Sequence, residues 1–171
     1  MDMDMNHPLI TALTGRIGPD GVITGNDATR AWTQEPRGRW HGRPLAVVRP
    51  SDRQQVQTAV ALCREHGVAI VPRGGGTGTV GGASVSEGSA EILLSLDRMR
   101  AIDSIDAAAA TLTAEAGVTL EQARIAAADH GLDVPLSLAS GGSATIGGII
   151  ATNAGGNTTI RHGNARRMVL G

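Results

Sequence analysis

The fold is decided by one stretch of the chain, VPRGGGTGTVGGA, which runs from Val71 to Ala83. It follows an apolar run, Val68 to Val71, of the kind that forms a buried strand. Consecutive glycines after a strand let several backbone N–H groups point into one concavity, and such a concavity suits a diphosphate. The stretch from Arg73 to Ala83 is therefore predicted to be a phosphate-binding loop.

Two common nucleotide motifs do not fit this loop. Gly76, Gly78 and Gly81 satisfy G-x-G-x-x-G, but that fingerprint needs a helix directly after the glycines. The residues that follow, Ser84 to Ala90, are too polar and too rich in turn formers for a packed helix. A Walker A loop is excluded because no Gly-Lys-Ser/Thr occurs. The loop is thus predicted to be a phosphate cradle of another type, with an ordinary flexible glycine loop as the alternative.

Upstream of the loop, the sequence predicts a strand, a helix and a second strand. Leu45 to Val48 is a short buried strand. Ser51 with Gln54 is predicted to form an N-cap and capping box, and apolar residues recur at helical spacing up to Cys63. Gly67 ends this helix before the strand Val68 to Val71. A connection of this length implies a parallel, right-handed βαβ unit.

Downstream, the pattern changes to an antiparallel one. Ile92 to Leu96 is a further buried strand, and Ala101 to Ile105 and Thr111 to Ala116 are expected to pair as antiparallel neighbours. Thr119 and Gln122 repeat the capping-box signal for a helix that ends near Asp129. The fold class is α+β (α/β): a small parallel βαβ subdomain followed by a mainly antiparallel one. A last apolar run, Met168 to Leu170, is interpreted as the opening of a strand.

A second loop rich in small residues runs from Pro135 to Gly156. It mixes glycines with hydroxyl and amide side chains, so that another molecule can approach the backbone closely. Ser143, Thr145 and Asn153 are candidates to bond a phosphate, a ribose or a ring edge. Tight corners of all-β proteins have a similar composition, but two dense glycine loops in one short chain favour a ligand.

The composition narrows the remaining function classes. The chain has 171 residues, of which 41% are hydrophobic and 18% charged, a globular balance. A net charge of −1 gives no electrostatic reason to expect nucleic acid or a membrane surface as a partner. No window approaches the ~20 apolar residues of a membrane span. The acidic start, Met1 to Met5, is unlike a basic targeting signal, so a cytoplasmic location is expected.

No metal site and no catalytic cysteine are predicted. Cys63 is the only cysteine and lies on the apolar side of a predicted helix, so a buried core residue is expected. The five histidines are scattered, without the spacing that metal ligation needs. Catalytic residues cannot be assigned from this sequence.

The two loops together carry a resemblance. VPRGGGTGTVGGA, SATIGGIIATNAGG (143–156) and RHGNARRMVLG (161–171) are similar to the FAD-binding, PCMH-type domain of the vanillyl-alcohol oxidase flavoprotein superfamily. Within it, the chain most resembles the FAD-linked D-2-hydroxyacid dehydrogenases, which include D-2-hydroxyglutarate and D-lactate dehydrogenases and the glycolate oxidase D subunit. The similarity covers nearly the whole chain from about Trp32.

This resemblance implies the residues of an FAD site. The first loop would hold the pyrophosphate through backbone donors, and the second would run along the flavin. The residues expected to contact FAD are Arg73, Gly74, Gly75, Gly76, Thr77, Gly78, Gly81, Pro135, Gly142, Thr145, Gly147, Gly148 and Asn153. Relatives with covalently attached flavin often have His where this chain has Thr77, so FAD is expected to be non-covalent. Relatives often have Asn where this chain has Ile149, and Tyr where it has His162.

The resemblance also implies an activity and partners. The expected reaction is oxidation of a small 2-hydroxyacid by hydride transfer to FAD, followed by electron transfer to a downstream acceptor. Residues 1–42 are expected to be an N-terminal extension and 43–171 an FAD-binding domain that stops before its end. The substrate domain of relatives would follow, so the isolated chain is expected to be inactive, and marginally stable or associated, with a homodimer left open. The alternatives are another flavin oxidase or reductase on the same fold, or an inactive nucleotide-binding module.

Overall fold

The computed structural model describes residues 7–171, which form two compact units that divide between Arg98 and Met99. The acidic start that was interpreted above lies outside the described residues. The predicted domain boundary at residue 42 stays a prediction. Residues from the segment before it pack in the same unit as residues 43–98, since a strand and a helix of that segment contact the sheet and helix that follow.

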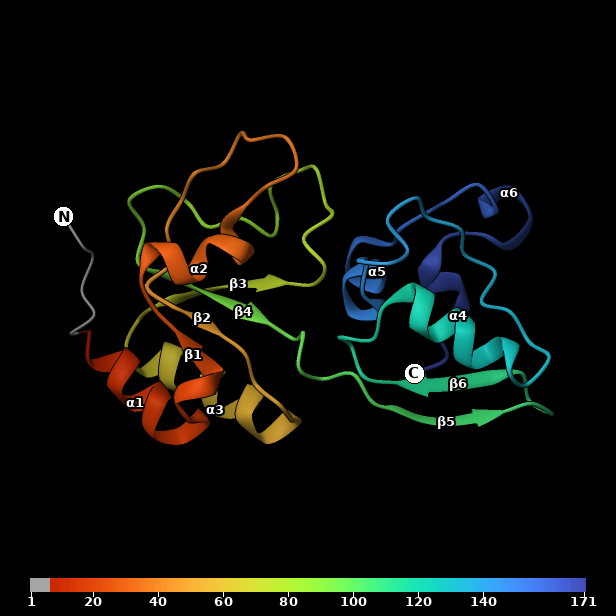
Figure 1. Ribbon diagram of the computed structural model, residues 1–171, viewed down its shortest axis with the longest axis horizontal. Coiled ribbons are helices and arrows are strands. Elements are labelled where there is room, and N and C mark those ends of the chain that lie inside the picture. The colour runs from red at the N-terminus through yellow and green to blue at the C-terminus, as the bar shows by residue number, and fades with distance from the viewer. Residues whose placement is uncertain (1–6) are drawn as a thin grey trace. The chain divides into compact units, whose positions relative to one another are not determined.

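The first unit is built on a four-stranded sheet (Figure 1). The strands lie in the order β1-β2-β4-β3, with β4 parallel to both neighbours and β1 antiparallel to β2. The strands on either side of the helix Arg53–Glu65 are β2 and β3, and their predicted parallel arrangement is confirmed. They are not neighbours, because β4 lies between them. The strands are β1 (Val22–Ile23), β2 (Val47–Val48), β3 (Ala69–Arg73) and β4 (Glu91–Ser95).

Each face of this sheet buries its own set of side chains because successive strand residues point to opposite faces. Val48 and Ile92 face a core formed with α1 (Pro8–Ile17) and α3 (Arg53–Glu65), which lie side by side in Figure 1. Val47 and Leu93 face the other way, onto Val85 and Trp32. Trp32 belongs to α2 (Asn26–Thr33), and a 3₁₀ turn, η1 (Pro19–Gly21), leads into β1. The glycine loop therefore begins on a sheet that is covered on both faces.

The helix α3 begins one residue later than its sequence signal indicated. Its N-cap is Asp52, whose carboxylate accepts a hydrogen bond from the backbone N–H of Gln55. The prediction of Ser51 with Gln54 is therefore wrong, although Ser51 donates its own N–H to the Gln55 side chain. A carboxylate is the stronger acceptor, and it also favours the positive N-terminal end of the helix. The helix ends before Gly67 as predicted.

The second unit packs helices against a two-stranded antiparallel sheet. The antiparallel pairing of β5 with β6 is confirmed, and α4 packs against β6 (Figure 1). The reciprocal capping box of Thr119 and Gln122 at the start of α4 is also confirmed. The elements are β5 (Ile102–Asp106), β6 (Thr111–Ala114), α4 (Leu120–Ala128), α5 (Ile146–Thr152), α6 (Thr159–His162) and η2 (Ala165–Met168).

Two features of this unit differ from the sequence prediction. The predicted strand at Met168 to Leu170 is wrong, because Met168 ends a 3₁₀ turn and residues 169–171 belong to no strand. A helix, α5, lies within the segment that was interpreted as one long loop. Ile149 on α5 is buried with Leu120, Leu136 and Ala165, so it serves as a core residue of this unit.

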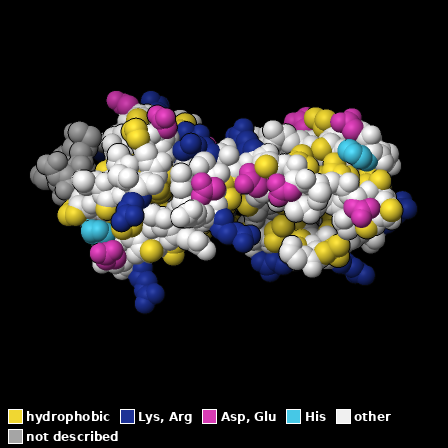
Figure 2. Space-filling model, turned by 90° about the horizontal axis from the view of Figure 1, so that it is seen from below, with side chains coloured by type: hydrophobic (Ala, Val, Ile, Leu, Met, Phe, Trp, Pro, Cys, Tyr) yellow, Lys and Arg dark blue, Asp and Glu magenta, His cyan; other side chains and the backbone are white. Residues whose placement is uncertain are grey.

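The surface carries both signs of charge. On the face that Figure 2 shows, arginine and acidic side chains are interspersed. No helix among residues 7–171 is long and apolar enough to cross a membrane.

Candidate cofactor site

The first glycine loop starts at the carboxyl end of β3, where ligands bind in open parallel sheets. β3 ends at Arg73, and its neighbour β4 ends at Ser95, which is paired with Arg73 in the ladder. The loop then runs to Ala83 without helix or strand. Its position thus agrees with the general location of binding sites on this type of sheet.

The side chain of Arg73 lies beneath the loop and is only 8% exposed. Its guanidinium donates one hydrogen bond to the carbonyl oxygen of Ala83 at 3.2 Å and another to that of Gln34 at 3.1 Å. Burial lowers the pKa of Arg73, but a guanidinium stays charged in proteins. Among residues 7–171, no carboxylate forms an ion pair with it. A buried positive charge without an anionic partner therefore underlies the loop.

A second arginine at the same end of the sheet is neutralised. Arg49 follows β2, and its Nε donates to the Asp97 carboxylate at 2.9 Å. Trp32 donates its indole N–H to the same carboxylate, and the Arg49 guanidinium lies 5.0 Å from the centre of the Trp32 ring. Arg73 differs from Arg49 in that its charge is buried and has no carboxylate partner among the described residues.

The backbone of the loop offers unused donors. In the part of the chain that the structure describes, no backbone N–H from residue 75 to residue 83 donates to a protein acceptor. Gly76 and Gly81 have φ angles of 68° and 82°, which residues with a side chain rarely adopt. A methyl group at Gly76 would also overlap the guanidinium of Arg73. The glycines thus permit a loop with free N–H groups next to a buried cation, and such a nest attracts anions.

The second loop leads into α5 and is closely packed. Thr145 is the N-cap of α5, and its side chain accepts from the backbone N–H of Gly148 at 3.4 Å. Gly147 lies against Ala116, because a methyl group at Gly147 would stand 2.8 Å from the Ala116 side chain. Its N–H donates to the Ala116 carbonyl at 2.9 Å. These contacts fix the start of α5.

Asn153 ends α5 in the left-handed conformation, with φ 51° and ψ 50°. Its amide oxygen accepts from the backbone N–H of Arg166 at 3.1 Å. The Arg166 guanidinium in turn donates to the carbonyls of Ile150 and Ala151 at the helix end. The amide oxygen of Asn153 therefore has a structural partner, while its NH₂ group makes no hydrogen bond to residues 7–171.

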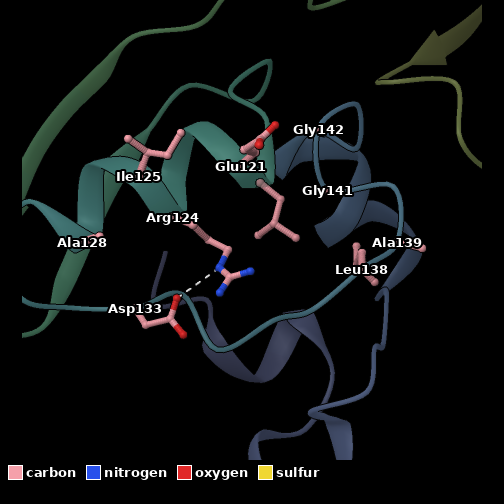
Figure 3. A pocket seen from close by; sticks show the side chains of 10 residues that line it. Glu121, Arg124, Ile125, Ala128, Asp133, Leu138, Ala139, Gly141 and Gly142 are labelled. Carbon is pink, nitrogen blue, oxygen red and sulfur yellow. Dashed lines mark hydrogen bonds and ion pairs between the residues drawn. The ribbon is translucent and has the colours of Figure 1, made fainter.

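Gly142 lines an open pocket of about 460 Å³ beside α4 (Figure 3). Glu121 lies next to Gly142, since a methyl group there would stand 3.0 Å from a Glu121 carboxylate oxygen. Across the pocket, Arg124 donates to Asp133 at 3.1 Å, as the dashed line in Figure 3 shows. Both sides of this ion pair are about half exposed, so it contributes little stability.

A second, more apolar hollow of about 760 Å³ lies between β6, α4, α5 and η2. Pro135 and Ile149 are among its lining residues. The carbonyl of Pro135 also accepts the hydroxyl hydrogen of Thr158 at 2.8 Å. Pro135 is thus the one predicted cofactor residue that lines this hollow.

The remaining candidates for chemistry have structural surroundings. Cys63 is buried in the core against α1, and burial raises the pKa of its thiol to about 11. The prediction of a core cysteine is confirmed. Among residues 7–171, no three His, Cys, Asp or Glu side chains gather as a metal site would require.

The predicted site residues fall into two groups. Arg73 to Gly78 and Gly81 lie in one loop of the first unit, whereas Pro135, Gly142, Thr145, Gly147, Gly148 and Asn153 belong to the second unit. Sequence reasoning missed the bond that Arg73 makes to the Ala83 carbonyl within the loop, and two groups that contact the loop from outside: the carbonyl of Gln34 and the ring of Trp40. Only Trp40 carries a signal, since it is one of two aromatics in the chain.

Solved structures share this fold. Alkyldihydroxyacetonephosphate synthase superposes with a TM-score of 0.83 at 22% identity, over 96% of this chain and 33% of the synthase. p-Cresol methylhydroxylase superposes with a TM-score of 0.70 at 24% identity, over 86% of this chain and 29% of the enzyme. The predicted PCMH-type fold is confirmed.

The family model described as FAD binding domain matches residues 44–171, so the chain belongs to this family. The D-2-hydroxyglutarate dehydrogenase of Xanthomonas citri pv. viticola is 44% identical over 83% of this chain and 29% of its own length. The enzyme of the same name from Stutzerimonas stutzeri is 37% identical over 95% of this chain and 35% of its own length. The chain thus spans about a third of the length of these relatives.

FAD is the cofactor that this family implies, and the first loop fits it. A diphosphate needs several donors and a compensating positive charge. Free backbone N–H groups and the unpaired Arg73 provide both kinds of group within one loop.

Proposed function

We propose that this chain binds FAD as part of an FAD-dependent oxidoreductase that oxidises a small 2-hydroxyacid of the D-2-hydroxyglutarate or D-lactate class. One observation carries the proposal of FAD binding: the buried, unpaired guanidinium of Arg73 beneath a loop with free N–H groups. The names of the relatives support the substrate class.

Each loop has its own role in this proposal. The backbone from Arg73 to Gly78 and at Gly81 holds the pyrophosphate, and the Arg73 charge offsets its negative charge through the loop. In the second unit, Thr145, Gly147 and Gly148 bring the start of α5 close to the flavin, while Pro135, Gly142 and Asn153 complete this contact set. Bound FAD would supply a hydride acceptor for the substrate carbon, and these protein groups would bind and orient it.

The flavin is proposed to be non-covalent. The first loop has Thr77 where relatives with covalent flavin often carry histidine, and the stretch from Arg73 to Ala83 contains no histidine. Acid precipitation of the FAD-loaded protein therefore releases all of the flavin into the supernatant. Flavin that stays with the precipitated protein would contradict this point.

The downstream electron acceptor, a cytoplasmic location and a homodimer also remain proposals. Several relatives carry the word mitochondrial in their names, for example the bovine D-2-hydroxyglutarate dehydrogenase. Fractionation of cells that express the protein tests the location, and sedimentation tests the oligomer.

FAD binding is tested by titrating the purified chain with FAD and following flavin fluorescence. Two variants of one glycine separate charge from size: Gly75→Asp adds a carboxylate, and Gly75→Asn adds a neutral group of the same shape. Saturable binding that Gly75→Asp abolishes and Gly75→Asn weakens less supports the diphosphate site. A folded chain without saturable binding, or equal loss in both variants, contradicts it.

The substrate class needs a separate test, with FAD-loaded protein that includes the part of the relatives' length that this chain does not match. Anaerobic addition of D-2-hydroxyglutarate or D-lactate is expected to bleach the flavin, while the L-enantiomers leave it oxidised. Bleaching by a sugar or an alcohol alone would instead assign the protein to another activity on this fold.

A further inference from the structure

A short segment before the family match, residues 34–42, lies against the first glycine loop. Its first residue, Gln34, offers the carbonyl oxygen that accepts from Arg73 at 3.1 Å. The same guanidinium reaches the carbonyl of Ala83, at the far end of the loop. Arg73 thus ties the end of the glycine loop to Gln34, which lies 39 residues before Arg73 in the chain.

The ring of Trp40 packs on the backbone of Gly81. A methyl group at Gly81 would overlap three atoms of the indole, Cε2, Nε1 and Cζ2. Trp40 is nevertheless 46% exposed, so the backbone of the loop covers one part of the ring and solvent reaches another. Two residues later, Gly42 approaches the Val85 carbonyl so closely that a side chain would overlap it. Residues 34–42 therefore contact the loop at Gly81, and they also contact Val85, which follows the end of the loop.

The position of Trp40 is set by a local turn. The carboxylate of Glu35 accepts from the backbone N–H groups of Arg37 at 3.0 Å and Arg39 at 2.9 Å. The N–H of Gly38 closes the turn on the Glu35 carbonyl at 3.0 Å. Because one carboxylate holds the N–H groups of Arg37 and Arg39, the chain enters Trp40 from a defined direction.

We propose that Trp40 is a positioning residue for FAD: its ring holds the Gly81 end of the glycine loop in the conformation that binds the diphosphate. This proposal rests on the function proposed above. The N–H groups from residue 75 to residue 83 make no hydrogen bonds to any described residue, and the Gly81 end is held by two bonds to its carbonyls, from the Ser84 N–H to Gly81 at 3.0 Å and from Arg73 to Ala83 at 3.2 Å. With so few bonds of its own, the loop gains order from packing against its surroundings. The indole supplies a flat, rigid surface for a backbone that has no side chain at this point.

Affinity measurements test the proposal with two substitutions at one position. If Trp40→Ala lowers the population of the binding conformation to about one tenth, the apparent Kd for FAD rises about tenfold. Trp40→Phe keeps an aromatic surface on Gly81 and is expected to bind within about twofold of the parent on the same reasoning. The midpoint of thermal unfolding is measured in parallel, because a residue that only supported the fold would change the midpoint and the Kd together, whereas a positioning residue changes the Kd and leaves the midpoint close to that of the parent.

Fluorescence supplies a readout that does not depend on whether Trp40→Ala folds. In Trp32→Phe, Trp40 is the only indole, and in Trp40→Phe, Trp32 is the only indole. ADP, which carries the diphosphate without the flavin, is titrated with excitation at the red edge of indole absorption. Saturable change in the emission of Trp40, with little change for Trp32, supports the proposal.

The outcomes separate this proposal from the one on which it rests. If the parent chain binds FAD and Trp40→Ala binds it equally well, the role of Trp40 is refuted and FAD binding stands. Displacement of FAD by ADP without any change in Trp40 emission refutes the role as well. If the folded parent binds neither FAD nor ADP, both proposals fall together.

Discussion

Replacing Gly76 by alanine is the sharpest test of how the first loop works. Gly76 has a φ of 68°, and a methyl group there would overlap the guanidinium of Arg73. An L-residue in this conformation costs about 1–2 kcal/mol. Displacing the guanidinium weakens its hydrogen bonds to the carbonyls of Gln34 and Ala83, and the net loss of one such bond costs about 1 kcal/mol.

The total is about 2–3 kcal/mol, and it acts on the binding conformation of the loop. Since about 1.4 kcal/mol corresponds to a factor of ten, FAD affinity is expected to fall about 30- to 150-fold. This free-energy cost does not lower the global free energy of unfolding by the same amount, because the loop of the variant can relax when no FAD is bound. The expected signature is therefore a large change in Kd with a small change in the unfolding midpoint.

The matched control is Gly82→Ala in the same loop. A methyl group at Gly82 meets nothing within 4 Å, and Gly82 has no positive φ. Titration of both variants with FAD, followed by flavin fluorescence, compares them directly. Binding by Gly76→Ala within about threefold of the parent would refute the reasoning, since it would limit the cost to well under 1 kcal/mol. Equal weakening by Gly82→Ala would show that any methyl group in the loop blocks the ligand.

Three further predictions concern the first unit. Leu93→Ala removes a fully buried side chain from the central strand and is expected to cost about 2–5 kcal/mol of unfolding free energy; a denaturant midpoint equal to the parent's would contradict this burial. Because burial raises the pKa of Cys63 to about 11, the thiol stays protonated at neutral pH, and a thiol reagent is expected to modify it only after unfolding. The backbone N–H of Arg39, and then that of Arg37, lower the pKa of Glu35. The ionised carboxylate therefore stabilises the turn fully at a pH above the unfolded pKa of 4.5, and this stabilisation is lost as the pH falls through the lower folded pKa. An NMR titration in which Glu35 has a pKa of 4.5 or higher would rule out this turn.

Local signals in the sequence were sufficient wherever a structure is stabilised by near neighbours. The capping box of Thr119 and Gln122 joins residues three apart, so the start of α4 could be predicted. The burial of Cys63 followed from apolar spacing along its own helix. Spacing alone does not settle burial, since Val60 lies on the same helix and is apolar but is 46% exposed. Periodicity predicts a face of a helix, but only packing defines how wide that face is.

Other elements escaped prediction because contacts distant in sequence create them. The start of α5 contains Gly147 and Gly148, which have low helix propensity, yet the carbonyls of Ala116 and Val118 accept hydrogen bonds from its first N–H groups. The polar helix α2 likewise has a weak sequence signal, but it is held to the sheet by Trp32, which bonds Asp97. Tertiary contacts override propensity in both places.

The sequence by itself determined that a glycine loop follows a strand of a parallel α/β unit, because glycine content and side-chain periodicity are local properties. The prediction that this strand is buried is wrong, because β3 lies at the edge of the sheet and its Ile70 and Val71 are only partly buried. Only the tertiary structure decided that β4 lies between β2 and β3, that the charge of Arg73 has no carboxylate partner, and that Trp40 covers Gly81. The order of strands, the pairing of a buried charge and the packing of an aromatic ring depend on which distant segments meet. That choice is made by the free energy of the whole folded unit, so no short stretch of sequence contains it.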